Sequence, residues 1–472
     1  MTADASLASV LGAGRSAPPA RAADSPAPLR TGARAVVILA TSAAYLVPAL
    51  PAAGAIRATR GRDDAARFLS RRCAALLQRL GPTFVKCGQM VGTRRDLIPP
   101  ALCEALDALA DAVEPMSPEQ ARAALSAAYG TDLGPFASVD LDPVASGSVA
   151  CVYRGTLAGG REVAIKLQRP GIRRVMAADL ALVRAVGALA ARLRAFRGTP
   201  VREIAGYVCD AVYAQLDFAR EAENLARLRA DLAPVPRVLV PAVERGASRD
   251  TALVMEFVPG LDASAAAGMG DAVRRRCAAR TLAAVYRMVF MDGFVHCDLH
   301  RGNLYFAGKG QVVVLDAGFT VQLSERIRRL FAEFFLHLSL GDGERCARIV
   351  VESSSGLRPG ADLEGFTRGM ADLVERSSRA PARDFSVIAF ATEMFALQRE
   401  HGLHAASEIV FPLLSLLVIE GTIRDLDPDV DFQQEAQPLL VKAVFDAPPG
   451  GWSPGSTQLS PQPATTQEQP CR

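Results

Sequence analysis

Lysine is almost absent from this chain. Its 472 residues include 53 basic side chains, but only Lys86, Lys166, Lys309 and Lys442 are lysines, which leaves 49 arginines. A retained lysine can mark chemistry that needs a compact ammonium group rather than a planar guanidinium, as at a phosphate site. The four lysines are therefore the first candidates for functional residues.

An excess of charge of one sign is also missing. The 50 acidic side chains leave a net charge of only +3, whereas binding to nucleic acid through a basic surface needs a concentrated surplus of lysine and arginine. We therefore expect no nucleic-acid partner. The nine cysteines are an odd number and form no C-x-x-C pair, which predicts reduced thiols and a cytoplasmic location.

One uncharged run lies near the N-terminus. Residues 35–56 are 22 residues without charge between Arg34 and Arg57, long enough to span a bilayer. Pro48 and Pro51 make the run only marginally hydrophobic, so three interpretations stay open. The first is a membrane anchor, which spans the membrane or rests on its cytoplasmic face. The second is a buried helix, and the third is a cleaved signal.

Composition and hydrophobic period divide the chain into segments of an α+β protein. Residues 1–33 are rich in Ala, Pro and Ser, and the end of the chain after Asp446 is rich in Pro, Gly, Ser, Gln and Thr, so both are expected to be disordered. Between them, helical patterns give way to short β-rich runs and then return. The predicted segments are 1–33 (disordered), 35–56 (hydrophobic), 65–135 (helical), 136–258 (β-rich lobe with inserted helices), 259–445 (helical lobe) and 446–472 (disordered tail).

A small-residue loop and a strand lysine predict a phosphate-binding site. The loop at 145–150 joins two predicted strands, and small residues let backbone N–H groups approach a polyphosphate. Lys166 ends the strand V-A-I-K, an arrangement in which the lysine pairs with α- and β-phosphates. Glu221, on a following predicted helix, is the candidate to hold Lys166, with Glu223 as a near rival. The predicted nucleotide-binding residues are Ala145, Ser146, Gly147, Ser148, Val149, Ala150, Lys166, Glu256 and Val258.

The strongest motif is HCDLHRGN at 296–303, followed by a predicted hairpin and by D-A-G at 316–318. The hairpin brings the loop of Asp298 and Asn303 beside Asp316. Two carboxylates and an amide on adjacent loops make an oxygen-rich site for Mg²⁺, so Asn303 and Asp316 are the predicted metal ligands. Asp298 is predicted to orient or deprotonate an acceptor, and the predicted catalytic residues are Lys166, Glu221 and Asp298.

A transition-metal site is the alternative for the same segment. His296 and His300 with Asp298 are suitable ligand types, although nothing else in the chain supplies the remaining ligands at a convincing spacing. Cys297 stands where many protein kinases carry an arginine that grips a phosphorylated loop, and no A-P-E follows Gly318. Regulation by activation-loop phosphorylation is therefore not expected.

These motifs, in this order, resemble the UbiB (AarF, Coq-type) family of atypical kinase-like ATPases. The segment LGPTFVKCGQMVGTRRDLIPP at 80–100 is similar to the family's K-x-G-Q signature, with Lys86, Gly88 and Gln89 in the defining places. The resemblance continues through ASGS, VAIKLQRPGI, DFAREAENL, HCDLHRGNL and DAG and ends near IEGTIRDLDPDVD at 419–431.

The resemblance implies an atypical protein-kinase-like bilobal fold with an N-terminal helical K-x-G-Q extension. In that fold Lys86 and Gln89 belong to a segment that folds over the active site, and they are assigned to nucleotide binding. The implied cofactors are ATP or ADP and Mg²⁺. The implied role is ATPase or lipid chemistry that supports prenylquinone biosynthesis, with isoprenoid or quinone-type lipids or biosynthetic enzymes as partners.

The chain departs from the family pattern in three places. Gln215-Leu216-Asp217 replaces E-x-D, Ala317 replaces the phenylalanine of D-F-G, and the hydrophobic hairpin typical of bacterial members does not follow Asp431. Two other functions therefore stay open. One is a nucleotide-binding regulatory or scaffold protein, and the other is a small-molecule phosphotransferase.

Overall fold

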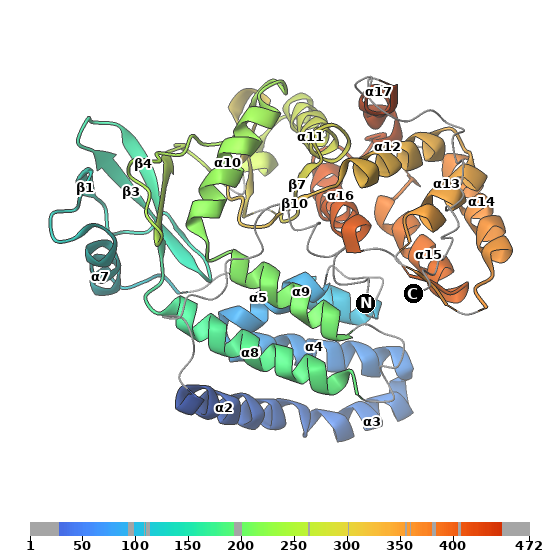
Figure 1. Ribbon diagram of the computed structural model, residues 1–472, viewed down its shortest axis with the longest axis horizontal. Helices are drawn as coiled ribbons and strands as arrows, with labels where there is room; N and C mark the ends of the chain where they lie inside the picture. The colour runs from blue at the N-terminus through green and yellow to red at the C-terminus, as the bar shows by residue number, and fades with distance from the viewer. Residues whose placement is uncertain are drawn as a thin grey trace, which may run out of the picture.

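The computed structural model describes residues 28–92, 99–107, 109, 114–192, 201–262, 265–300, 302–354, 356–358, 360–379, 384–404 and 407–445. They form an α+β, kinase-like bilobal fold, with a sheet-containing lobe beside a larger helical lobe and a layer of helices along one side of both (Figure 1). The predicted tail at 446–472 and residues 1–27 lie outside the described residues.

The smaller lobe is built on an antiparallel sheet of order β1-β3-β4-β6, with β2 added on β3. Alternating residues of β3 and β4, among them Tyr153 and Ile165, are fully buried against α7. Helix α7 begins at a capping box, in which Ser117 and Gln120 each bind the other's backbone N–H. The elements are β1 (Phe136–Val139), β2 (Ala145–Ser146), β3 (Ala150–Leu157), β4 (Glu162–Gln168), β6 (Ala252–Glu256) and α7 (Pro118–Tyr129).

Three helices are inserted between β4 and β6, namely α8 (Ile172–Ala190), α9 (Val201–Ala214) and α10 (Phe218–Leu232). After α10, within the predicted β-rich lobe, residues 238–243 form only the short β5 (Val238–Leu239). It pairs in parallel with β9 (Gln311–Val314) of the helical lobe. The Arg237 carbonyl accepts a hydrogen bond from Val312 N, so the chain is already attached to the second lobe before it returns along β6.

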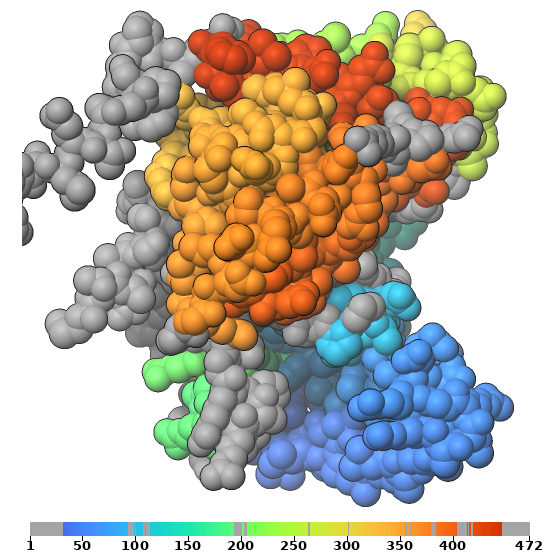
Figure 2. Space-filling model, turned by 90° about the vertical axis from the view of Figure 1, so that its right-hand side faces the viewer, coloured from blue at the N-terminus to red at the C-terminus, as the bar shows by residue number. Residues whose placement is uncertain are grey.

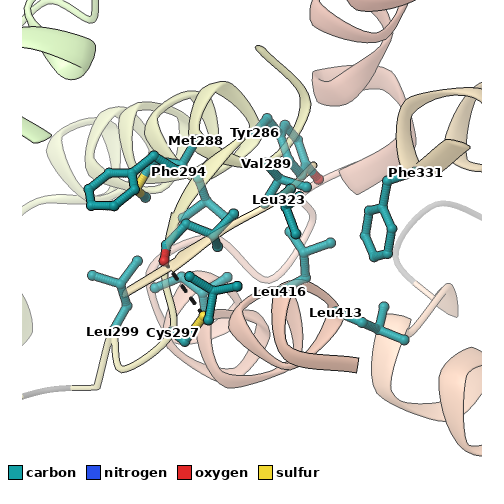
Figure 3. Packing of buried hydrophobic residues seen from close by; sticks show 14 of the residues in the cluster. Tyr286, Met288, Val289, Phe294, Cys297, Leu299, Leu323, Phe331, Leu413 and Leu416 are labelled. Carbon is teal, nitrogen blue, oxygen red and sulfur yellow. Dashed lines mark hydrogen bonds between the residues drawn. The ribbon is translucent and has the colours of Figure 1, made fainter. Parts of the chain in front are cut away.

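The helical lobe surrounds the segment that carries the HCDLHRGN motif. Figure 3 shows Cys297 and Leu299 in a buried cluster with Tyr286, Leu323 and Leu416. Its elements are α11 (Asp271–Tyr286), the π-helical turn η4 (Arg287–Asp292), β7 (Phe294–His296), β8 (Leu304–Ala307), β9 (Gln311–Val314), β10 (Thr320–Gln322), α12 (Glu325–Ser339), α13 (Gly343–Glu352), β11 (Gly356–Leu357), α14 (Leu363–Arg379), α15 (Val387–Glu400), β12 (Leu403–His404), α16 (Ser407–Leu426) and α17 (Phe432–Phe445), with short 3₁₀ turns η3 (Ala265–Gly268) and η5 (Gly308–Gly310).

The extension consists of α2 (Pro28–Leu46), α3 (Ala49–Arg60), α4 (Arg62–Leu80), α5 (Pro82–Gly92) and α6 (Pro100–Asp107). Gly61 and Gly81 separate successive helices with φ of 96° and 111°, values that favour glycine. Figure 2 shows α2 to α4 in blue, projecting below the orange helices of the larger lobe.

Two expectations for the N-terminus are wrong. Residues 28–33, expected to be disordered, belong to α2, because Arg34 fastens this helix to the body of the protein. Arg34 Nε lies 2.7 Å from Asp179 Oδ1 of α8, and Nη2 donates to the Leu80 carbonyl at 2.6 Å. The interpretation of residues 35–56 as a buried helix is also wrong, since only 6% of the apolar window within Gly32–Arg60 is buried.

Candidate active site

Lys166 lies at the centre of an ionic cluster. It occupies the middle of the sheet, where β4 pairs with both β3 and β6. Its Nζ lies 2.6 Å from Glu221 Oε1 and 2.7 Å from Asp316 Oδ2. Burial acts to lower the pKa of Lys166, but the two carboxylates outweigh it and hold the pKa above its usual range. The ammonium group therefore stays charged and joins the two lobes.

Glu221, rather than Glu223, is the carboxylate that reaches the lysine. Asp217 is the N-cap of α10 and accepts a hydrogen bond from Arg220 N at 3.0 Å, which sets where the helix begins. Because the helix begins at this N-cap, Glu221 faces the interior, with 1% of its side chain exposed, and Glu223 lies on the surface. Burial and the nearby charge of Asp316 raise the pKa of Glu221 to about 7, against the opposing effect of Lys166.

Asp316 is held in an unusual backbone conformation. Its φ is 62°, in the left-handed region, and its Oδ1 accepts a hydrogen bond from Gly318 N at 2.6 Å. Burial acts to raise the pKa of Asp316, but Lys166 and the Gly318 N–H overcome this and hold it well below its usual range. Asn224 on α10 donates to the Ala317 carbonyl at 2.9 Å, so the same helix that carries Glu221 also fixes the D-A-G turn.

His296 connects the Asp298 loop to Asp316. It is fully buried, its Nδ1 accepts from Asp298 N at 3.1 Å, and its Nε2 lies 3.0 Å from the Asp316 carbonyl. An imidazole that accepts at Nδ1 must carry its proton at Nε2, so it donates to that carbonyl. Burial lowers the pKa of His296, in agreement with this neutral form.

Asn303 is oriented by the same loop. Its Nδ2 donates to the Asp298 carbonyl at 2.8 Å and also lies 3.3 Å from His300 Nε2. The hairpin of β8 and β9 then returns the chain, and Leu315 N donates to the Asn303 carbonyl at 2.8 Å. The predicted hairpin is therefore present, and it sets Asn303 and Asp298 on the loop adjoining Asp316.

The donors on these loops suit a hard cation. Asn303 uses its amide nitrogen within the protein, which leaves its oxygen as an acceptor, and Asp316 adds a carboxylate of low pKa. Such oxygen atoms fit Mg²⁺, which usually keeps several waters and binds substrate phosphates as well. A transition-metal site does not fit, because both ring nitrogens of His296 already make hydrogen bonds inside the protein. The described residues contain no group of three or more His, Cys, Asp and Glu side chains placed to hold a metal.

The small-residue loop is anchored by an arginine that the sequence did not single out. Arg169 follows β4, and its Nε donates to the Gly147 carbonyl at 3.0 Å while Nη2 donates to Ser146 Oγ at 2.9 Å. Nη2 also donates to the Glu114 carbonyl at 2.7 Å. Ser148 and Val149 are buried, and Gly147 N donates to the Ala150 carbonyl at 2.9 Å, which closes the turn.

Glu256 and Val258 lie where β6 leaves the sheet. Glu256 pairs with Val163 of β4, but its carboxylate points to the preceding connection, where Oε2 accepts from Ala242 N at 3.1 Å. The structure thus does not bring this carboxylate to Lys166, and nucleotide binding by Glu256 and Val258 stays a prediction.

The K-x-G-Q residues lie on α5 and contribute to the packing between helices of the extension. Gly88 permits α5 to pack closely, since a Cβ there would lie 2.6 Å from Leu77 Cδ1 and 2.9 Å from Leu109 Cδ1. Gln89 Nε2 donates to the Leu109 carbonyl at 3.0 Å, and Lys86 is half-buried on the same helix. Gly88 and Gln89 therefore have an architectural role, and nucleotide binding by Lys86 and Gln89 stays a prediction.

Comparison with known proteins identifies the family to which this chain belongs. Residues 108–350 match the ABC1 atypical kinase-like domain. The chain is 32% identical over 399 residues to "Probable protein kinase UbiB" of Xanthomonas campestris pv. campestris (strain B100), covering 81% of this chain and 71% of that protein. The chain belongs to the UbiB family.

Other UbiB relatives show the same degree of similarity. A protein of the same name from Pseudomonas putida (strain F1) is 31% identical over 384 residues, covering 79% of this chain and 71% of its own. Among solved structures, the complex of Rv3197 with erythromycin from Mycobacterium tuberculosis aligns with a TM-score of 0.54 and 21% identity. It covers 76% of this chain and 92% of its own, and at this identity it supports the fold alone.

Proposed function

We propose that this UbiB-family protein binds ATP or ADP with Mg²⁺ and catalyses ATP hydrolysis or phosphoryl transfer. The observation that carries the proposal is the cluster of Lys166, Glu221 and Asp316, set beside the loop of Asp298 and Asn303 and joined to it through His296. A strand lysine held by a helix glutamate, with metal-binding oxygens opposite, is the arrangement that protein kinases use for phosphoryl transfer.

Each residue has a defined part in this proposal. Lys166 leaves Asp316 to bind the nucleotide phosphates, and Glu221 keeps the ammonium group in place meanwhile. Asp298, about one-third exposed, faces solvent where an acceptor hydroxyl or water can approach and is positioned to orient it and take its proton. Asn303 and Asp316 would hold Mg²⁺, which would neutralise developing negative charge on the phosphates.

The relatives' names support a role in ubiquinone-type metabolism. The similar proteins are called "Probable protein kinase UbiB", and we infer that this chain acts in prenylquinone or related isoprenoid-lipid metabolism. Isoprenoid or quinone-type lipids and the enzymes that make them are the proposed partners.

The surface of α2 and α3 supports contact with the cytoplasmic face of a membrane. Every exposed residue between positions 35 and 56 is Val, Leu, Ala, Pro or Gly. Val36, Leu39 and Leu50 are each more than 60% exposed. A helix that faced water would carry polar residues there, and the terminal arginines Arg57 and Arg60 of α3 suit anionic headgroups.

The opposite face of α2 argues for a helix that rests on the membrane rather than spans it. Ile38, Tyr45 and Leu46 pack against α4, α5 and α8. Helix α4 carries Asp63, Asp64 and several arginines, which would be costly to bring into the bilayer with it. Docked in this way, α2 can offer only its apolar outer face to lipid.

Flotation of the full chain with vesicles tests this surface. We expect binding to phosphatidylglycerol-containing vesicles to be strongly weakened in Val37→Asp, and retained in Val441→Asp, which adds the same charge at an equally exposed valine of α17. Equal binding of all three proteins would exclude this surface. Self-association that shields α2, together with no vesicle binding, would show instead that this surface binds a second copy of the chain.

Turnover by the purified full chain tests the catalytic proposal. ATP hydrolysis should require Mg²⁺, be stimulated by anionic or quinone-containing vesicles, and be abolished in Asp298→Asn. Tight nucleotide binding without turnover would favour a regulatory or scaffold role. Transfer of phosphate to a soluble acceptor would favour a small-molecule phosphotransferase, and failure to bind any nucleotide would refute the proposal.

A further inference from the structure

We propose that Arg169 is a positioning residue that shapes the small-residue loop at 145–150 for phosphate binding and couples this loop to the extension. The inference rests on the proposed nucleotide-binding function. It concerns a residue that would act through the loop, without touching the nucleotide.

The first step is the match between one guanidinium group and three acceptors. Nε provides one hydrogen to the Gly147 carbonyl at 3.0 Å. Nη2 provides two, to Ser146 Oγ at 2.9 Å and to the Glu114 carbonyl at 2.7 Å. A planar guanidinium group can donate hydrogen bonds from different nitrogen atoms to these three acceptors. A lysine would have to donate all three from a single nitrogen.

The second step follows from peptide geometry. The Gly147–Ser148 peptide is trans, and in a trans peptide the carbonyl and the next N–H point in opposite directions. Because Arg169 Nε fixes the Gly147 carbonyl, it also directs the Ser148 N–H away from the guanidinium. Arg169 N donates to the Val149 carbonyl at 2.9 Å and fixes the Val149–Ala150 peptide by the same geometry. Arg169 thus sets which way the loop presents backbone N–H groups, the donors that a phosphate would need.

The third step is the link to the extension. The Glu114 carbonyl belongs to the connection that leads from the helices of the extension to α7 and the sheet. Because a single Nη2 atom binds both Glu114 and Ser146, a change in the position of this connection changes the support of the loop. Arg169 therefore transmits the placement of the extension to the nucleotide loop.

The neighbouring Arg173 provides a matched control. It also lies at the junction of β4 and α8, and it also donates to three acceptors, Gln168 Oε1 at 2.9 Å, the Leu216 carbonyl at 2.5 Å and the Asp250 carbonyl at 3.4 Å. None of them belongs to the loop. Loss of Arg173 should therefore cost comparable stability without releasing residues 145–150.

The experiment compares Arg169→Ala, Arg169→Lys and Arg173→Ala in the full chain. Titration with MgADP should show about tenfold weaker binding for both Arg169 variants, the loss expected when charge-assisted hydrogen bonds that orient the loop are removed. Added methylguanidinium should restore affinity to Arg169→Ala, and methylammonium should not. Hydrogen exchange without nucleotide should become faster at 145–150 and 114–117 in Arg169→Ala, and stay at the wild-type rate there in Arg173→Ala.

Wild-type affinity and unchanged exchange in Arg169→Ala would overturn the inference. Equal loss of affinity in Arg169→Ala and Arg173→Ala without methylguanidinium rescue would also overturn it, since it would show a general effect on folding. If Arg169→Ala fails to fold, Arg169→Lys decides by the same two measurements. If the wild-type protein binds no nucleotide, the proposed function fails, while the exchange rates still decide whether Arg169 holds the loop.

Discussion

Replacement of Lys166 by methionine tests the ionic cluster at the centre of the site. The change removes an ammonium group that lies 2.6 Å from Glu221 Oε1 and 2.7 Å from Asp316 Oδ2. At an effective dielectric constant of about 20, each contact corresponds to roughly 6 kcal/mol of attraction, much of it offset by the cost of burying the charges. Removal of one partner from a buried pair typically costs about 3–5 kcal/mol, and we expect Lys166→Met to lose this much free energy of unfolding at about pH 8.

The loss should depend on pH in a defined direction. The pKa of Glu221 is raised to about 7 in the folded protein, and without Lys166 it should rise further. A carboxyl group whose folded pKa lies above its unfolded pKa contributes stability that is full below the unfolded pKa and is lost as pH rises through the folded pKa. The deficit of Lys166→Met should therefore be smaller at about pH 5.5, where Glu221 is protonated and the lost contact is the one with Asp316, and grow toward about pH 8.

Urea unfolding of wild type, Lys166→Met and Lys166→Met/Glu221→Gln at both pH values measures this effect. The double variant removes the orphaned carboxylate, so it should be more stable than Lys166→Met at about pH 8 and lack its pH dependence. A deficit below about 1 kcal/mol at both pH values would show that the cluster contributes little. A deficit that is large but the same at both would refute the role assigned to Glu221.

Three further substitutions test other parts of the molecule. Asp316→Asn should nearly abolish stabilisation of the protein by MgATP in thermal unfolding while leaving the fold intact, because it removes carboxylate charge with little change in shape; unchanged MgATP stabilisation would exclude Asp316 as a metal ligand. Gly88→Ala should lower the free energy of unfolding by about 1–3 kcal/mol, because its Cβ would press on Leu77 and Leu109; a neutral result would refute the packing role. Arg34→Met should accelerate proteolysis within α2, because it leaves Asp179, 1% exposed, without its cation; an unchanged rate would show that apolar contacts alone hold the helix.

Composition explains which site residues could be found from the sequence. Lys166 could be predicted because lysine is rare here, so its occurrence carries information. Arg169 makes equally specific hydrogen bonds, but as one of 49 arginines it does not stand out in the sequence. The acceptors of Arg169 lie in two segments, at 146–147 and at Glu114, that are distant from Arg169 in the chain, and only folding brings them together.

Helical phase explains a second difference. The choice between Glu221 and Glu223 depends on where α10 begins, which the Asp217 cap fixes. The spacing of Asn224, one turn after Glu221, places it on the same face of α10, but the sequence does not show that the Ala317 carbonyl lies within its reach. The role of Gly88 could not be predicted, because its neighbours come from other helices.

The region from β4 to α8 connects the proposed nucleotide site to the proposed lipid surface. Lys166 in β4 reaches the ionic cluster, Arg169 at the end of the strand holds the loop, and Asp179 on α8 binds Arg34 of α2. Helix α8 packs against both α9 and α2, so we expect a displacement of α2 to reach Arg169 through α8. If vesicle binding stimulates turnover, Asp179→Asn should weaken the stimulation while leaving turnover without lipid unchanged, because it loosens the connection to α2 without altering Lys166 or Arg169. Stimulation equal to that of the wild type would show that lipid acts by a route that does not pass through α8.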